Sequence, residues 1–231
     1  MMSDLLTALP PGALMMLAAV PLVLVPHHAR QVVMLLAIAG SAFSLTAGAG
    51  QHLNIEMLGL EMSLYRADHL SLPFAIVFHI AAALNVFYGW HERKATDHVA
   101  GLSYAGAAIA ALHAGDLVTL FIWWEATAVT SVFLILASGT QRARRAAMRY
   151  LIVQVASGVL LLAGAAMLYS ESGSLAFAGM TLGSTATWLI FIAFGIKAAF
   201  PLLNGWLQDA YPEATVIGTV VLSSFTTKLA I

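Results

Sequence analysis

The sequence predicts an all-α, polytopic transmembrane helix bundle of about eight spans. Two observations carry this prediction. Hydrophobic residues make up 61% of the 231 residues and charged residues only 9%, which is too little polar surface to coat a water-soluble globule. Apolar runs also recur along the whole chain at lengths near the roughly 20 residues that cross a bilayer core. Lipid is therefore the expected solvent.

The connections between the spans differ in charge in an alternating way. Arginine, lysine and histidine follow the odd-numbered spans, whereas the even-numbered spans are followed by acidic or mixed segments. Because short basic loops stay in the cytoplasm, we expect a multi-pass protein of the cell (inner) membrane with its N-terminus outside. The expected spans are 12–26, 31–50, 69–90, 98–114, 117–138, 150–170, 185–209 and 213–231.

Three further segments shape the expected organisation. The first apolar run, 13–25, lacks the flanks of a removable signal peptide and is expected to be a retained span. Segment 51–68 has mixed polarity and is expected to be an external loop with strand or interfacial structure. Small residues crowd the fourth span, Gly106 among them, which is typical of helices that approach closely.

Composition excludes several classes of site. The formal net charge of −1 gives no electrostatic motive for binding nucleic acid. The chain has no cysteine and its eight histidines show no paired metal-binding motif, so we expect no metal, no cofactor and no redox centre in it. No catalytic site is predicted either, which leaves open whether the chain serves an enzyme as a subunit.

Glu125 is the first of three ionisable residues inside predicted spans. It lies eight residues into its span, which is roughly 12 Å along a helix and close to the bilayer midplane. A central acidic residue costs roughly 2.5–3.5 kcal/mol on insertion, and such residues are functional by default. The alternative is a protonated glutamate that only bonds a neighbouring helix.

Lys197 lies deep in the seventh span, and Pro201 follows four residues later. The proline has no amide hydrogen and clashes with the carbonyl of Lys197, so the helix is predicted to break just beyond the lysine. Broken helices at membrane depth line cavities and build ion sites. The alternative is a lysine that snorkels to the surface, which is easier for Lys228 in the last span.

Lys228, His79 and His113 are weaker candidates. Lys228 follows a run of serines and threonines that either holds water or cements helix packing. His79 in the third span and His113 at the end of the fourth are candidate relay residues, because histidine titrates near neutral pH. A lone histidine in a bundle is more often a satisfied packing residue.

These residues suggest a protonation switch. Two unit charges about 4 Å apart interact by roughly 4 kcal/mol at an effective dielectric of 20, so separating a glutamate from a lysine changes how firmly the lysine holds its proton. We hypothesise that Glu125 and Lys197 form such a pair and that Lys228 receives or passes on the proton through water.

Two stretches, DLVTLFIWWEATAVTSVFLILAS and GIKAAFPLLNGWLQDAYPEATVIGTVVLSSFTTKLAI, resemble the antiporter-like proton-channel family. Its members are large membrane subunits of Mrp-type sodium/proton antiporters and the membrane-arm subunits of respiratory complex I. The matching residues, in order, are Glu125, Lys197, Pro201, Trp206, Leu207, Asp209, Ala210, Glu213, Ala214 and Lys228. The resemblance implies proton-transfer roles for Glu125, Lys197 and Lys228, and makes Asp209 and Glu213 candidate relay residues.

The resemblance also implies a domain organisation. Residues 1–98 would be N-terminal transmembrane helices. Residues 99–231 would be the first of two inverted repeats, which is cut off inside the eighth predicted span of the chain. A partner subunit would supply the second repeat, or the chain is a fragment. The family histidine after the proline is replaced by Asn204, so a histidine relay there is not expected.

Three functions remain open at this point. The first is a proton-translocating subunit of a multi-subunit antiporter, with sodium as a second cation. The next is a proton-pumping subunit of an NADH:quinone oxidoreductase whose redox chemistry lies elsewhere, since the chain has no nucleotide-binding glycine motif. The last is a structural membrane partner of a soluble enzyme. All three place the chain among other membrane subunits and lipid.

Overall fold

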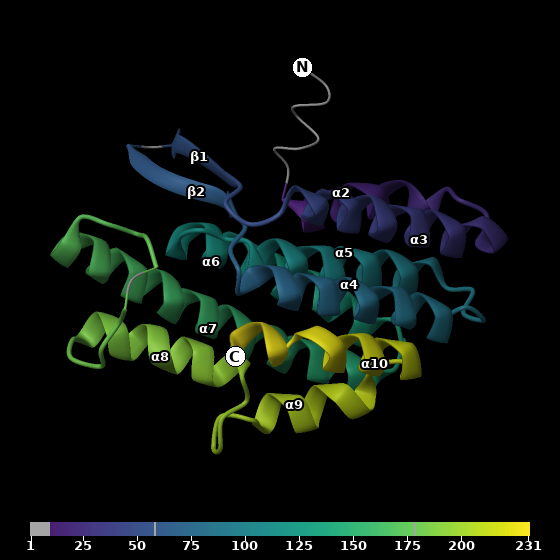
Figure 1. The fold of residues 1–231 in the computed structure, drawn as a ribbon. Coiled ribbons are helices and arrows are strands. Elements are labelled where there is room, and N and C mark those ends of the chain that lie inside the picture. Colours follow the sequence, from purple (N-terminus) through teal and green to yellow (C-terminus); the bar gives the residue numbers. More distant parts are fainter. Residues whose placement is uncertain (1–9, 58, 178) are drawn as a thin grey trace.

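A computed structural model describes residues 10–231 of the protein except residues 58 and 178. Its helices run side by side along one common direction, and a two-stranded hairpin covers one end of the bundle (Figure 1). The α-helices are α2 (Pro11–Ala19), α3 (His27–Phe43), α4 (Ser71–Tyr88), α5 (Ala95–Leu112), α6 (Leu117–Leu136), α7 (Gln141–Ser172), α8 (Thr185–Lys197), α9 (Gly205–Ala210) and α10 (Val216–Phe225). Short 3-10 turns extend several of them: η1 (Val20–Val23), η2 (Ser44–Ala47), η3 (Tyr211–Glu213) and η4 (Lys228–Ala230).

Four helical segments in the described chain are long and apolar enough to cross a membrane. They are His27–Ala47, Ser71–Tyr88, Leu117–Leu136 and Gln141–Ser172. Their outer surfaces carry large apolar side chains, such as Leu36, Leu84 and Ile152, which are 61–66% exposed. A soluble protein would not expose such a surface, so the protein is a multi-pass membrane protein and lipid covers these side chains.

The hairpin is fixed to the start of α6 by one carboxylate. Strands β1 (His52–Met57) and β2 (Leu60–Arg66) pair antiparallel, which confirms the strand structure predicted for this segment. Asp116 precedes α6 and caps it, because its side chain accepts the backbone N–H groups of Val118 and Thr119. Its second oxygen accepts the N–H of Ser63 in β2 at 2.7 Å. The hairpin and α6 therefore share one anchor.

Close backbone packing joins α2 to α5. A Cβ atom added at Gly12 would lie 1.8 Å from the carbonyl oxygen of Gly106, and one added at Gly106 would lie 2.6 Å from the carbonyl oxygen of Gly12. The two helices touch through their backbones, which no larger residue would allow. The close approach predicted from the small residues of this span is confirmed at Gly106.

The basic residues of three connections gather at one end of the bundle. The Arg30 guanidinium at the start of α3 donates to the backbone carbonyl of Arg93, between α4 and α5. The Lys94 ammonium donates to the carbonyl of Ala137 at the end of α6. The hairpin lies at the opposite end (Figure 1). The charge alternation along the sequence therefore corresponds to two chemically different ends.

Helix α7 is longer than the predicted span 150–170. It begins at Gln141, where the Thr140 side chain accepts the N–H of Ala143 as a cap. Its first turns carry Arg142, Arg144 and Arg145, whose low hydropathy excluded them from the predicted span. Arginine is nevertheless a good helix former, so the helix can begin there. The helix therefore extends beyond the apolar segment at the basic end.

A methyl group at Gly12 tests the contact between α2 and α5. We expect Gly12→Ala to destabilise the bundle by about 3 kcal/mol, because the added carbon meets rigid backbone. The control is Gly40→Ala, whose Cβ would lie 3.4 Å from the flexible end of Leu14. Thermal unfolding of the purified variants, followed by tryptophan fluorescence, measures the difference. Equal midpoints would contradict the contact.

Candidate functional site

Helix α8 ends at Lys197, as the position of Pro201 predicts. The chain resumes as a helix only at Gly205, and in between Ala199 and Leu202 adopt positive φ angles of 59° and 74°. Such angles are strained for residues with a side chain. The break removes helical hydrogen-bond donors from the carbonyls at the end of α8. A residue of α9 replaces one of them, since the Trp206 indole N–H donates to the oxygen of Ile196 at 2.9 Å. The predicted break is confirmed.

The Lys197 side chain is buried against α6, and 1% of its surface is exposed. Its ammonium donates to the hydroxyl of Thr127 at 2.8 Å and to the carbonyl oxygen of Trp124 at 3.2 Å. The same ammonium lies over the Trp124 ring, 4.2 Å from its centroid. Two oxygens and a π face thus solvate a charge that lipid would reject. The snorkelling alternative does not describe Lys197 in this structure.

Trp124 is itself held from two other helices. Its indole N–H donates to Ser157 of α7 at 3.1 Å, and the Ser157 hydroxyl donates to the carbonyl of Ala193 in α8. The ring of Phe194 packs edge-on against the indole, with centroids 5.0 Å apart. Helices α6, α7 and α8 therefore fix the ring on which the lysine rests.

Glu125 occupies a notch in α7 that exists because Gly158 has no side chain. A Cβ at Gly158 would lie 1.7 Å from Oε1 of Glu125 and 2.8 Å from its carboxyl carbon. The glutamate is half-buried, and its Oε1 atom has no hydrogen-bond partner among the described residues. Glu125 follows Trp124 directly in sequence, so it lies on the same turn of α6 that receives Lys197.

No ion pair joins Glu125 to Lys197 within the described chain. The ion pairs there join Arg66 to Asp68, Arg142 to Glu213 and Arg149 to Asp209. The lysine ammonium instead contacts the residue before the glutamate and the residue two positions after it. The Lys197 ammonium therefore meets the turn of α6 that bears Glu125 without forming an ion pair with it.

Gln154 is a buried polar residue of this site that the sequence reasoning missed. None of its surface is exposed, and neither its amide nitrogen nor its amide oxygen has a partner in the described structure. It lies on α7 one turn from Gly158 and one turn from Tyr150, whose hydroxyl bonds Ser131 of α6 at 2.9 Å. Its spacing from Tyr150 and Gly158 is the sequence signal that could have identified it.

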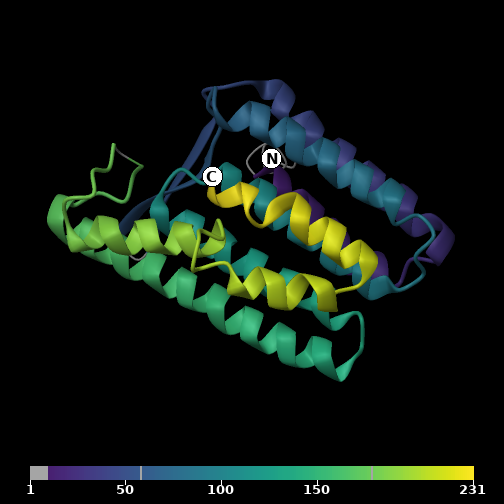
Figure 2. The ribbon, with the colours of Figure 1, turned by 90° about the horizontal axis from the view of Figure 1, so that it is seen from below.

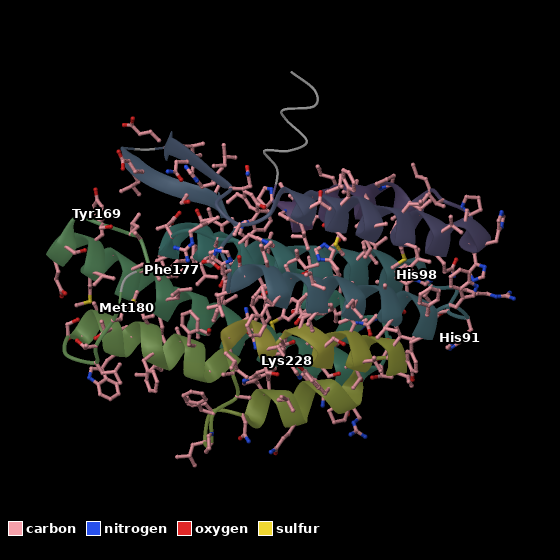
Figure 3. The ribbon with its side chains drawn as sticks, viewed as in Figure 1. His91, His98, Tyr169, Phe177, Met180 and Lys228 are labelled. Atoms are coloured by element: carbon pink, nitrogen blue, oxygen red, sulfur yellow. The ribbon has the colours of Figure 1, made fainter. Side chains whose placement is uncertain are left out.

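Lys228 differs from the expectation of a buried lysine. It is exposed, and its ammonium donates to the carbonyl of Ser223 at 2.6 Å (Figure 3). The physical reason is that α10 ends at Phe225 and the following 3-10 turn directs Lys228 off the packed face. The packed face carries Thr226 instead, whose hydroxyl bonds that of Tyr104 at 2.5 Å. The structure does not bring Lys228 and Lys197 into contact.

The candidate relay histidines lie apart from the lysine site and are buried. His79 bonds the Ala75 carbonyl through Nδ1 and the Ser41 hydroxyl through Nε2, at 2.7 and 2.9 Å. His113 bonds the carbonyl of Ile109 through Nδ1, and its Nε2 has no partner among the described residues. The packing interpretation therefore accounts for both ring nitrogens of His79 but for only one of His113.

The acidic candidates pair with arginines of α7. Glu213 lies 2.7 Å from Arg142, and Asp209 forms an ion pair with Arg149. Both pairs are at the basic end, beyond the break after α8. In this structure the two acids tie α9 and the following turn to α7, and they do not contact the lysines.

The comparisons with known proteins bear on this arrangement. The family described as "NADH:quinone oxidoreductase/Mrp antiporter, TM" matches residues 114–231, just over half of the 231-residue chain. The chain belongs to this family. The matched segment contains α6 to α10, and with them Glu125, Lys197 and Lys228.

Curated relatives of this antiporter-family chain include a subunit named NAD(P)H-quinone oxidoreductase chain 4 from Synechococcus elongatus. It is 29% identical over 186 residues, which cover 76% of this chain and 35% of that protein. A protein of the same kind from Synechocystis is 28% identical and is covered over 33% of its length. The chain therefore spans only a minor part of these relatives.

Solved structures share the fold. They include respiratory complex I from Thermus thermophilus (TM-score 0.75, 20% identity, 96% of this chain and 53% of that one). Another is an archaeal membrane-bound sulfane sulfur reductase, with a TM-score of 0.74 and 23% identity over 98% of this chain and 38% of that one. The Mrp complex from Dietzia has a TM-score of 0.72 and 23% identity over 95% of this chain and 47% of that one. At these identities the likeness shows the fold alone.

The glycine notch yields a test of where the Glu125 carboxyl lies. We expect Gly158→Ala to displace this carboxyl from α7, because a flexible side-chain end moves more easily than backbone. Its modification by a hydrophobic carbodiimide should then become faster, while the fold loses no more than about 1 kcal/mol. Mass spectrometry of the labelled peptide gives the rate.

The matched control is Gly101→Ala, whose added carbon would lie 3.8 Å from Val221 in ordinary contact. Glu125→Gln supplies the unreactive blank. An unchanged labelling rate in Gly158→Ala would place the carboxyl elsewhere.

Proposed function

We propose that this chain is a proton-translocating membrane subunit of a multi-subunit complex, in which Lys197 and Glu125 bind and release the transported proton. One observation carries the proposal. A fully buried lysine stands at the end of a broken helix, and it rests on the helical turn that bears a half-buried glutamate. Ionisable groups buried within membrane helices are functional candidates by default, and proton relays are one of their recurring uses.

The separation of the two groups supports a switch and not a permanent ion pair. The Lys197 ammonium is held by neutral groups, the Trp124 carbonyl, the Thr127 hydroxyl and an aromatic face. Neutral oxygens accept from an ammonium without compensating its charge, so the proton is held less firmly than it would be beside a carboxylate. Movement of Glu125 toward Lys197 would strengthen the hold, and movement away would release the proton.

Water is the proposed link between them. Glu125 Oε1 and both amide atoms of Gln154 are buried without partners among the described residues. Buried polar groups of this kind are commonly satisfied by ordered water. We place such water at the junction of α6 and α7, where it would connect Glu125 to the hydroxyl pair of Ser131 and Tyr150.

Two settings suit such a subunit. The antiporter setting is a cation/proton antiporter of the Mrp type, with sodium as a second cation. The oxidoreductase setting is the membrane arm of a complex I-like NADH:quinone oxidoreductase, and the names of the curated relatives favour it. In both, other membrane subunits surround the chain and a second antiporter-like repeat completes the path. Purification of the native complex with identification of its subunits separates the settings.

Removing either charge is expected to stop transport. In proteoliposomes of the native complex, Glu125→Gln and Lys197→Ala should each lower proton flux by roughly 100-fold or more, because the group that carries the proton is lost. Flux is read from a pH-sensitive dye trapped in the vesicles. The control is Glu56→Gln, which removes an exposed carboxylate from the hairpin.

Assembly of each variant is checked by gel filtration before flux is compared. Full flux in an assembled Lys197→Ala complex would refute the proposal.

We further propose that all eight helical segments cross the membrane, with α8 and α9 as one broken span, the basic end in the cytoplasm and the N-terminus outside. Short basic connections stay on the cytoplasmic side. The shorter helices fit this arrangement because packing buries much of their surface, as at Gly12 and Met15 of α2.

Single cysteines test this topology without background, because the sequence contains no cysteine. Glu171→Cys, at the hairpin end, should react with an impermeant maleimide in intact cells. Arg93→Cys, at the basic end, should react only after the cells are permeabilised. The reverse pattern would invert the orientation, and equal labelling of both would mean that the two residues lie on one side.

A further inference from the structure

A small cavity lies between α3, α4, α5 and α10. Its water-accessible space is about 30 Å³, enough for about two water molecules. Among its otherwise apolar lining, the side chains of Asn85, Asp97 and His98 are polar. His98 lies toward the same end of the bundle as His91 of the connection between α4 and α5 (Figure 3), and Figure 2 shows α10 running past this region. The cavity therefore lies near the basic end, apart from Glu125 and Lys197.

Asp97 presents one carboxylate oxygen with no protein partner. The side chain is 2% exposed, and Oδ1 accepts the hydroxyl hydrogen of Thr215 at 2.6 Å. The same hydroxyl oxygen accepts the N–H of Gly218, so this contact joins the start of α5 to the start of α10. Oδ2 is buried and has no hydrogen-bond partner among the described residues. Only one of its two oxygens is used by the fold.

The charged groups around Asp97 are all engaged elsewhere. Lys94 directs its ammonium to the carbonyl of Ala137 at 3.3 Å. His98 donates from Nε2 to the carbonyl of Glu92, and the Glu92 carboxylate accepts the backbone N–H groups of Arg93 and Lys94. No described cation forms an ion pair with Asp97. A buried carboxylate without a cation is costly as an anion, so it takes up a proton or recruits water.

The polar lining leads from Asp97 toward the end of α10. Asn85 of α4 shares the cavity with Asp97, and its amide donates to the hydroxyl of Ser224 at 3.3 Å. Ser224 lies in the last turn of α10, which ends at Phe225. The cavity thus has an acid at one side and, beside Asn85, a hydroxyl near the end of α10 at the other.

We propose that Asp97 is a second proton-binding carboxyl of this protein, which exchanges its proton with water in the cavity beside Asn85. The ionised Oδ2 takes a proton from a water cluster supplied at the connection between α4 and α5. The resulting Oδ2–H donates that proton back to cavity water, and water alongside Asn85 and Ser224 carries it on toward the end of α10. The binding step stands alone, whereas the onward passage of the proton rests on the proposed function.

Infrared titration of the full chain in its native complex tests the binding step. Between pH 4 and pH 9, wild type should show a carbonyl band of a buried carboxylic acid that disappears as pH rises and shifts in heavy water. Asp97→Asn should lack this band and Glu92→Gln should retain it. Asparagine keeps an oxygen that can accept the Thr215 hydroxyl hydrogen, so the fold is expected to survive. The heavy-water shift is measured on the wild type and does not depend on any variant. A spectrum of Asp97→Asn that is identical to wild type overturns the proposal.

Proton uptake tests the passage. In inverted vesicles, which present the basic end to the medium, Asp97→Asn should lose most of its flux at alkaline pH, where proton supply limits the rate, and regain it at acidic pH. Glu92→Gln should follow the wild-type profile. A uniform loss at every pH would overturn the entry role, because it would reflect structure alone. Absence of flux in wild type would defeat the proposed function and leave the infrared result standing.

Discussion

The accommodation of the Lys197 charge inside the bundle is the constraint on which the other features depend. Lipid offers it no solvation, so the protein has to supply oxygens and an aromatic face at the depth of the lysine. The Trp124 carbonyl, the Thr127 hydroxyl and the indole ring provide them, and α7 and α8 hold that ring in place. The end of α8 at Lys197 then allows the side chain to reach α6.

Much of the fold could be predicted because membrane physics is restrictive. Pro201 indicated where a helix had to end, and α8 ends at Lys197. The small residues of α5 indicated a close approach, and Gly106 meets the backbone of α2. Hydropathy located the apolar segments but missed the start of α7. The arginines in its first turns lower the mean hydropathy, so this part of the helix was predicted as a loop.

The rest of the site could not be predicted, since it depends on contacts between helices. Gly158 is one of 18 glycines, and only the packing of α6 on α7 shows that it makes room for Glu125. Gln154 and Asp97 look like ordinary polar residues until their unpartnered atoms are found in the interior. Lys228 was expected inside the last predicted span, yet it is exposed and its ammonium lies on the Ser223 carbonyl, because α10 ends before it.

The two ion pairs between α7 and the segment after the break have a mechanical consequence. Arg149 with Asp209 and Arg142 with Glu213 fasten α9 and its following turn to the longest helix of the bundle. On the other side, Phe194 packs on the Trp124 ring and the Ser157 hydroxyl donates to the Ala193 carbonyl, and both contacts hold α8. Both flanks are clamped, so an axial or rotational displacement of Lys197 would have to be taken up in residues 198–204. This connector between α8 and α9 is the part of the span that forms no α-helix, so it is where such a movement would be absorbed.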